Sequence, residues 1–229
     1  MAIALAGLRE FAMHKLTFGN SRNAVRNVLC LGAHCDDIEI GCGGTILRLM
    51  KENSQLRFHW VVFSSTAQRK REALKAARMF LGPTTRSHVV IQKFRDSFFP
   101  YEGRAIKQLF ESIKKKFQPD LIFTHYRDDL HQDHRVVSEL TYNTFRDHLV
   151  WEYEIPKYDG DLGNPNLFSP LSEAVARRKV AALIEHFPSQ RSHRWFTADT
   201  FFAMLRLRGI GCNAASGFAE AFYCRKAVI

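Results

Sequence analysis

Two groups of residues in this sequence carry side chains that bind metal ions and move protons. The first group is His34, Asp36 and Asp37, which directly follows the apolar run of residues 28–31. A histidine and two carboxylates at the end of a buried strand are costly to hide without a partner, and the partner we expect is a metal ion. In a bend after the strand, His34 and Asp37 can point to one site. Asp36 then lies beside that site as an unligated carboxylate that accepts a proton from a bound water.

The second group is His131, Asp133 and His134. Asp129 with Gln132 three residues later resembles a capping box, which predicts that a helix begins here. Residues three apart share a helix face, so His134 can complete the metal set while His131 faces the same cavity without ligating. Asp133 is then placed to orient one of the imidazoles. Three nitrogen and oxygen ligands are typical of zinc in hydrolases, where the fourth position holds a water whose pKa falls to about 7.

The scaffold that must position these groups is predicted by alternating apolar and amphipathic segments. The predicted strands are residues 28–31, 58–63, 89–91 and 121–124, and the predicted helices between them are residues 68–81 and 106–117. Such alternation indicates an α/β fold with a mainly parallel sheet flanked by helices. Both groups follow a predicted parallel strand, so we expect them at the same edge of the sheet, where such folds bind ligands. Residues 41–45 are rich in glycine, and we interpret them as a turn.

The second half of the chain is less regular. Its predicted elements are a strand at residues 151–155, a loop at 156–170, a helix that begins at Ser169 and Pro170, a shorter helix at 202–207 and a closing strand at 219–223 that carries Glu220. A loop of that length is typical of lids and specificity walls. We expect one domain at residues 26–229, preceded by an extension at residues 1–25.

Composition narrows the class of protein. With 229 residues, 46% hydrophobic and 24% charged, the chain has the make-up of a folded globular domain. The five cysteines show no zinc-finger spacing, which favours a reducing cytosol, and no apolar run is long enough to span a membrane. We therefore expect a soluble cytoplasmic protein.

The formal charge of +10 leaves anionic partners open. A rival hypothesis from another class is a basic nucleotide-binding or nucleic-acid-binding protein that uses residues 41–45 as a phosphate cradle. That run lacks the P-loop lysine, and the basic clusters lie in predicted helices, where a solvated face is the simpler interpretation.

A family resemblance joins the two groups. Ala-His-Cys-Asp-Asp at residues 33–37 with Gly-Cys-Gly-Gly-Thr at 41–45, and Asp-x-His-x-Asp-His-Arg at 129–135, resemble the two signature motifs of the PIG-L/LmbE-like zinc-dependent N-acetyl sugar deacetylases. The resemblance implies a Rossmann-like, LmbE-like fold. It also implies Zn²⁺, or another divalent metal, on His34, Asp37 and His134. Asp36 would be the general base, and His131 would polarise the carbonyl or act as an acid, with Asp133 as the third catalytic residue.

The implied activity is that of a metal-dependent N-deacetylase, a hydrolase that removes an acetyl group from an amino sugar or a sugar conjugate by cleaving a linear amide. Its partner would be a small-molecule N-acetylated sugar conjugate and not nucleic acid, and the chain could form a homo-oligomer. Arg69 and Asp96 would hold sugar hydroxyls, with an ordinary surface ion pair as the alternative for each. The nearest rival enzyme is a metal-dependent amidase that acts on a non-sugar substrate.

The chain departs from the family pattern at two positions. Cys35 stands where the first motif has proline, and Gln132 stands where proline is common. Neither change removes an implied ligand. Cys35 could also be a ligand or nucleophile, but its carboxylate neighbours disfavour a thiolate.

Overall fold

The computed structural model describes residues 25–82 and 86–228, so the predicted extension at residues 1–25 lies outside the described residues except for Val25. A seven-stranded sheet with the order β3-β2-β1-β4-β5-β7-β6 forms the centre. The strands are β1 (Asn27–Gly32), β2 (Arg57–Ser64), β3 (His88–Phe94), β4 (Leu121–His125), β5 (Leu149–Tyr153), β6 (Leu167–Leu171) and β7 (Phe218–Tyr223). The first five are parallel, and β7 runs antiparallel to both β5 and β6. The expected α/β architecture is confirmed.

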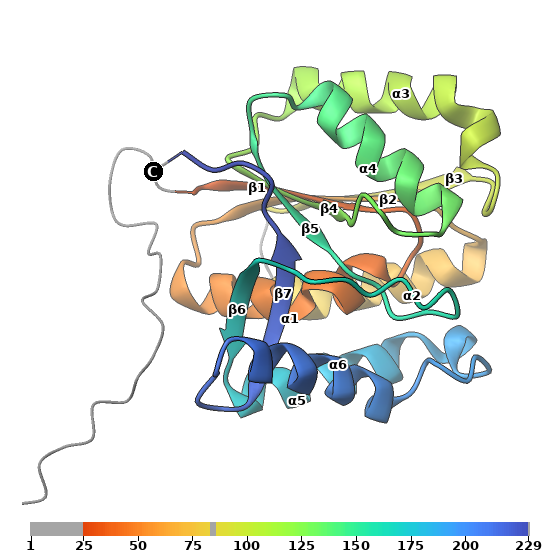
Figure 1. Cartoon of the computed structure of the whole chain (residues 1–229). Coiled ribbons are helices and arrows are strands. Elements are labelled where there is room, and N and C mark those ends of the chain that lie inside the picture. Colours follow the sequence, from red (N-terminus) through yellow and green to blue (C-terminus); the bar gives the residue numbers. More distant parts are fainter. Residues whose placement is uncertain (1–24, 83–85, 229) are drawn as a thin grey trace, which may run out of the picture.

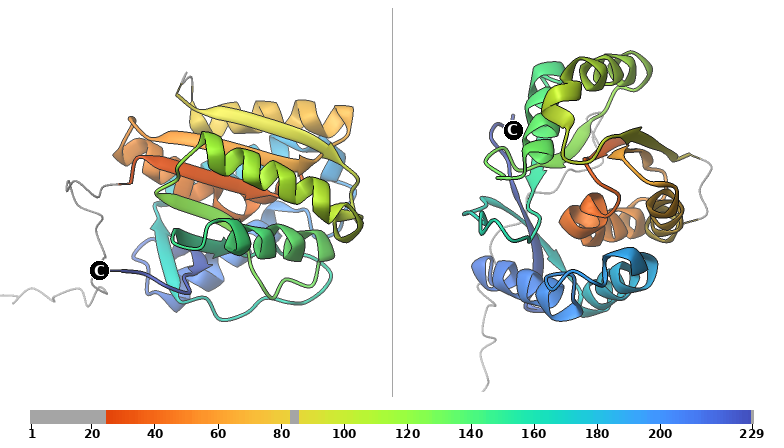
Figure 2. Two further views of the ribbon diagram at one scale, coloured as in Figure 1. Left: turned by 90° about the horizontal axis from the view of Figure 1, so that it is seen from above. Right: turned by 90° about the vertical axis from the view of Figure 1, so that its right-hand side faces the viewer.

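Helices cover both faces of this sheet. They are α1 (Asp37–Glu52), α2 (Ala67–Leu81), α3 (Phe99–Lys116), α4 (Gln132–Thr144), α5 (Glu173–His186) and α6 (Ala198–Gly211), with a short 3₁₀ helix at Pro188–Gln190. Helices α3 and α4 lie on one face, while α1 and α2, with α5 and α6 beyond them, lie on the other (Figure 1, Figure 2). None of the helices in the described residues is long and apolar enough to cross a membrane.

Strand β1 is buried on both faces, as its continuous apolar run predicts. Val28 and Cys30 face the core formed with α1, α2, α5 and α6, while Leu29 and Leu31 face the core formed with α3 and α4. Because the chain order reverses between β1 and β4, the carboxyl ends of these two strands flank the switch point of the sheet. Both groups of polar residues begin there.

The glycine-rich run is not a turn, and that expectation is wrong. Residues 41–45 lie inside α1. Their glycines let this helix approach its neighbours closely. A Cβ atom on Gly41 would lie 2.1 Å from the Tyr153 ring, and one on Gly43 would lie 2.6 Å from the Phe80 ring. The glycines therefore allow tight packing of the helix that follows the first polar group.

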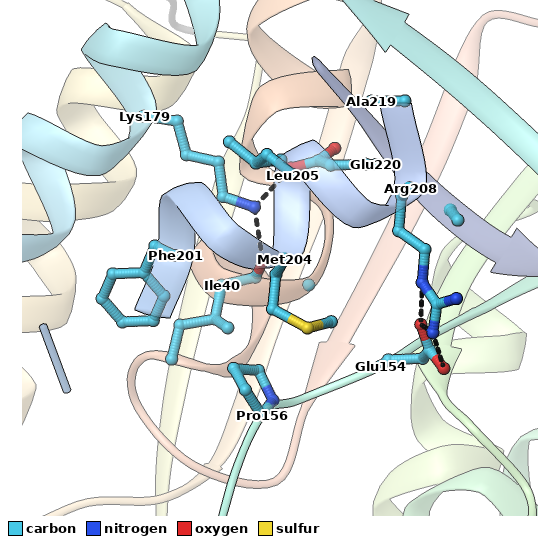
Figure 3. A pocket seen from close by; sticks show the side chains of 12 residues that line it. Ile40, Glu154, Pro156, Lys179, Phe201, Met204, Leu205, Arg208, Ala219 and Glu220 are labelled. Carbon is cyan, nitrogen blue, oxygen red and sulfur yellow. Dashed lines mark hydrogen bonds and ion pairs between the residues drawn. The ribbon is translucent and has the colours of Figure 1, made fainter. Parts of the chain in front are cut away.

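A buried ion pair holds the closing strand, β7, against α1. Lys179 donates to Glu220 at 2.6 Å and to the carbonyl of Ile40 at 2.5 Å (Figure 3). Glu220 also accepts the backbone N–H groups of Gly44 and Thr45 at 2.7 and 2.6 Å. Glu220 thus supports the helix from behind rather than entering the site.

The expected loop at residues 156–170 is shorter than predicted. Leu167–Leu171 forms β6, and α5 begins after Ser172, whose side chain accepts the N–H of Val175, so Ser169 is not the cap. Pro170 is tolerated in β6 because this strand lies at the edge of the sheet, where a missing N–H is harmless.

Candidate active site

Three potential metal ligands from the two sequence groups converge at the switch point. The Nδ1 atom of His34 lies 3.1 Å from Nε2 of His134 and 3.5 Å from Oδ2 of Asp37, and Oδ1 of Asp37 lies 3.6 Å from Nε2 of His134. All three side chains are buried. His34 belongs to the turn after β1, Asp37 begins α1, and His134 lies in the first turn of α4.

In both His34 and His134, the ring nitrogen that faces away from the other histidine contacts a carboxylate. Nε2 of His34 lies 3.3 Å from Asp133 and 3.2 Å from Asp96, and Nδ1 of His134 lies 2.9 Å from Asp129. When these nitrogens donate their protons to the carboxylates, the two nitrogens that face each other have no proton to share. A cation between them satisfies both lone pairs, so the geometry of this donor set fits a metal ion.

The electrostatics of His134 and Asp37 suit metal binding. Burial alone would lower the pKa of His34, but the charge of Asp37 and the contacts with Asp133 and Asp96 raise it well above its usual value, so a cation bound at His34 would have to displace a proton. Burial, followed by the charge of His125, lowers the pKa of His134 to about 3, so its ring is neutral. Burial alone would raise the pKa of Asp37, but His134, His125 and His34 hold it well below its usual value. The nitrogen and oxygen donors of the set are of the types that bind a divalent metal ion.

Asp36 lies beside this cluster and is 4% exposed. Its Oδ1 atom accepts a hydrogen bond of 2.5 Å from Nη2 of Arg69. Burial raises the pKa of Asp36, and the Arg69 guanidinium opposes that shift. Arg69 thus contacts the expected base, and its expected contact with a sugar hydroxyl stays a prediction.

His131 lies against the rings of both His34 and His134. Its ring stacks on that of His134 at a centroid distance of 4.5 Å and lies 4.9 Å from that of His34. Nδ1 of His131 accepts the backbone N–H of Asp133 at 3.2 Å, so His131 itself caps α4. Burial and then the charge of His34 lower its pKa, which leaves a neutral ring with its proton on Nε2.

The predicted capping box of Asp129 and Gln132 is wrong. Asp129 instead accepts the N–H of His131 at 2.8 Å and the Nδ1 proton of His134, because a carboxylate beside a buried imidazole is better satisfied there. The Gln132 side chain donates to the carbonyl of Ser97 in the loop after β3.

Asp133 joins that loop to His34. It is fully buried and accepts the N–H groups of Ser97 at 2.7 Å and Phe99 at 3.1 Å. Ser97 has a φ of 66°, the left-handed region that a side chain disfavours. This strained turn carries Asp96 to the edge of the cluster, where its contact with His34 lowers its pKa to about 2.

Sequence reasoning missed His125. This residue ends β4, is fully buried, and stacks on His134 at a centroid distance of 3.9 Å. Its Nε2 atom accepts the N–H of Ala33 at 2.9 Å and lies 3.2 Å from Asp37. We expected the strand to end at Thr124, and a polar residue directly after an apolar run was the signal that could have revealed His125.

Cys35 has a structural role in packing the turn after β1 against β2. Its thiol is buried and lies 3.4 Å from the carbonyl of Ser64, to which it donates. Burial raises the pKa of this thiol, so it stays protonated. A protonated thiol that is already bonded to the neighbouring strand is neither a good ligand nor a nucleophile.

Comparison with known proteins decides the family. The family model described as PIG-L, GlcNAc-PI de-N-acetylase, matches residues 29–145, just over half of the chain and the part that carries both groups. The chain belongs to the PIG-L family. This PIG-L protein is thus an enzyme of the metal-dependent N-deacetylase class, which hydrolyses amide bonds.

Individual relatives share the sequence pattern or the fold. The PIG-L chain is 26% identical to the uncharacterized deacetylase YaiS of Escherichia coli over 73% of its length and 94% of that of YaiS. The N,N'-diacetylchitobiose deacetylase of Pyrococcus horikoshii shares the fold with a TM-score of 0.69 and 20% identity, over 91% of this chain and 86% of that one. The 4-carboxy-2-hydroxymuconate hydratase GalB of Pseudomonas putida also shares it, with a TM-score of 0.72 and 16% identity, over 89% and 98% of the two chains. Because GalB is a hydratase, the fold alone does not define the reaction.

Proposed function

We propose that this protein is a zinc-dependent hydrolase that removes the acetyl group from an N-acetylated amino sugar or sugar conjugate. The observation that supports this proposal most directly is the convergence of His34, Asp37 and His134. The other ring nitrogen of each histidine contacts a carboxylate. These three residues would hold the ion. When bound, Zn²⁺ would lower the pKa of a water molecule and polarise the carbonyl of the amide.

Asp36 is the proposed general base. It is buried beside the ligands and does not belong to the converging set, so its carboxylate is available to take a proton from the attacking water. Arg69 holds one of its oxygens in place. The proton that Asp36 accepts can then pass to the leaving nitrogen, since an amine leaves far more readily than an amide anion.

His131 is the proposed electrophile. Because its Nδ1 atom accepts a backbone N–H, the neutral ring can donate only from Nε2. A donor in that position stabilises the negative charge that develops on the amide oxygen, a contribution of about 3 kcal/mol for one such hydrogen bond. Asp133 supports the site through His34, to which it is bonded, rather than through His131.

The nucleotide-binding rival has little support from this geometry. The N–H groups of Gly44 and Thr45, which would cradle a phosphate, are bonded to the carboxylate of Glu220. A negative charge already occupies the position where an anion would bind.

The test is a substrate profile of the purified full chain, with acetate release as the readout. We expect acetate from N-acetylglucosamine or its conjugates and little from N-acetylated amino acids or simple N-alkylacetamides. Acetate release from the non-sugar amides alone would replace this proposal with the non-sugar amidase. A protein that binds zinc but releases no acetate from either class would refute the deacetylase assignment of the site.

A further inference from the structure

Helix α6 is apolar on its outer face as well as on the face that packs against the core. Phe201, Leu205 and Gly209 point inward and are buried. On the opposite side of the helix, Leu207 and Ile210 are 52% and 68% exposed. A helix at the surface of a domain typically has a polar outer face, whereas a helix that is apolar all round is typically covered on both sides. The outer face of α6 therefore has the composition of a contact surface.

Five exposed residues form a line along this outer face. Successive members of the line are three or four positions apart, so they are neighbours on one side of the helix. We name them the α6 stripe, and they are Asp199, Ala203, Arg206, Leu207 and Ile210. Helices α5 and α6 form the outermost layer on this side of the molecule (Figure 1, Figure 2), and within the described residues the stripe stays uncovered.

A surface hollow adjoins the middle of the α6 stripe. It has a volume of about 470 Å³ and is lined by Arg177, Phe202, Ala203, Arg206 and Phe218. The guanidinium carbon of Arg206 lies 5.9 Å from the centroid of the Phe218 ring. The lining thus combines aromatic rings with two positive charges. Such a surface fits an acidic side chain that projects from an apolar face.

The stripe itself carries an acidic side chain of this kind. Asp199 lies in the first turn of α6, and Arg206 follows seven residues later, about 10 Å along the helix axis. Neither side chain forms an ion pair with another residue in the part of the chain that the structure describes. When two copies of α6 pack antiparallel across a two-fold axis, Asp199 of each copy meets Arg206 of the partner subunit. A parallel pairing would place like charges together, so the stripe is self-complementary only in the antiparallel arrangement.

We propose that the α6 stripe is the interface of a two-fold symmetric dimer, and that the partner is a second copy of this chain. Two chains with a net charge of +10 each repel one another, so their interface must bring opposite charges together. The antiparallel pairing does this twice per dimer. It also places Ala203 near the axis, where a small side chain lets the helices approach, and removes Leu207 and Ile210 from water. This inference is independent of the proposed function.

The experiment measures the mass of the full chain by sedimentation over a range of protein concentrations. The wild type should dimerise. Arg206→Asp brings acidic side chains together across the axis and Asp199→Arg brings basic ones together, so each variant alone should dimerise at least about tenfold more weakly. An equimolar mixture of the two variants should recover the wild-type dissociation constant, because every charge pair in the mixed dimer is again opposite.

The matched control for the charge changes is Arg104→Asp. Arg104 is an exposed residue of α3, on the other face of the sheet, and its replacement alters the net charge as Arg206→Asp does. This variant should dimerise like the wild type. Leu207→Ser with Ile210→Ser leaves all charges in place and should also weaken the dimer at least about tenfold, since it removes the apolar contact.

Three results would overturn the inference. The first is a wild-type chain that stays monomeric at every concentration. The second is a mixture of Arg206→Asp and Asp199→Arg that associates no better than either variant alone. The third is an assembly that none of the α6 variants weakens, because its interface would then lie on another face of the molecule.

Discussion

Nδ1 of His34 lies 3.1 Å from Nε2 of His134, although the two residues are 100 positions apart in the chain. The contact exists because β1 and β4 are parallel neighbours whose carboxyl ends meet at one edge of the sheet. In each ring the other nitrogen carries the proton and donates it to a carboxylate. The two facing nitrogens are therefore arranged to share a cation.

Replacing His134 should remove the metal. His134→Ala deletes a converging nitrogen and leaves the buried Asp129 without its imidazole partner, and metal affinity should fall at least about 100-fold, since outer contacts alone change it by up to that factor. The measurement is a zinc titration against a competing chelator. The exposed His193 provides the control, because His193→Ala should bind zinc as the wild type does. Equal affinity in His134→Ala and the wild type would remove this residue from the ligand set.

Replacing Asp36 should separate binding from turnover. Asp36→Asn keeps the volume of the side chain and its place beside Arg69 but cannot accept a proton. We expect unchanged zinc content and a loss of about 10²- to 10⁴-fold in kcat, the range of general base catalysis. Metal analysis and acetate release on the same sample provide both readouts. An active Asp36→Asn protein would force the base assignment onto another residue.

A glycine-to-alanine substitution should have opposite effects on stability in α1 and in α3. Gly41→Ala places a methyl group 2.1 Å from the ring of Tyr153, which is fully buried with its hydroxyl bonded to the carbonyl of Leu31 and cannot move aside. The free energy of unfolding should fall by about 2 kcal/mol or more. Gly103 in α3 has no atom within 4 Å of the added carbon, so Gly103→Ala should stabilise the protein by about 0.5–1 kcal/mol. Urea unfolding measures both, and a stable Gly41→Ala protein would contradict the close approach.

His59 predicts a loss of stability in mild acid that is independent of the site. Burial, followed by the charges of His88 and Lys116, lowers the pKa of His59 from 6.5 to about 4. The unfolded chain therefore takes up this proton at a higher pH than the folded chain does. The stability contribution is complete above pH 6.5 and is lost as the pH falls toward 4. After allowance for the water that reaches the ring, the loss should be about 1–2 kcal/mol.

The check on His59 is urea unfolding at neutral pH and at pH 5. The difference between the two unfolding free energies should be smaller in His59→Gln than in the wild type. Exposed His193 again supplies a control, since His193→Gln should leave the difference unchanged. An equal pH dependence in His59→Gln and the wild type would show that protonation of His59 is not linked to unfolding.

The scaffold could be predicted from the sequence because apolar residues recur with different periods in strands and in helices. The run at residues 28–31 and the helix from Gln68 could be read directly, and parallel pairing then places the residues after β1 and β4 together. The family assignment through the two motifs is confirmed by the match over residues 29–145. The site roles remain predictions that the experiments above test.

The parts that could not be predicted depend on contacts between distant side chains. The glycines of α1 resemble a turn until Tyr153 and Phe80 are known to press against them. The bond between Arg69 and Asp36 joins residues 33 positions apart, and no local pattern indicates it. Likewise, no local pattern indicates that Lys157 forms an ion pair with Asp129.

The most direct test of the account is to strip the full-length protein of metal with a chelator and titrate zinc back while measuring acetate release from N-acetylated sugar conjugates. The account predicts that one equivalent of zinc binds per chain and restores the activity in proportion to its occupancy, and that His134→Ala does neither. Full acetate release from the metal-free protein, or a wild-type chain that binds no zinc, would contradict it.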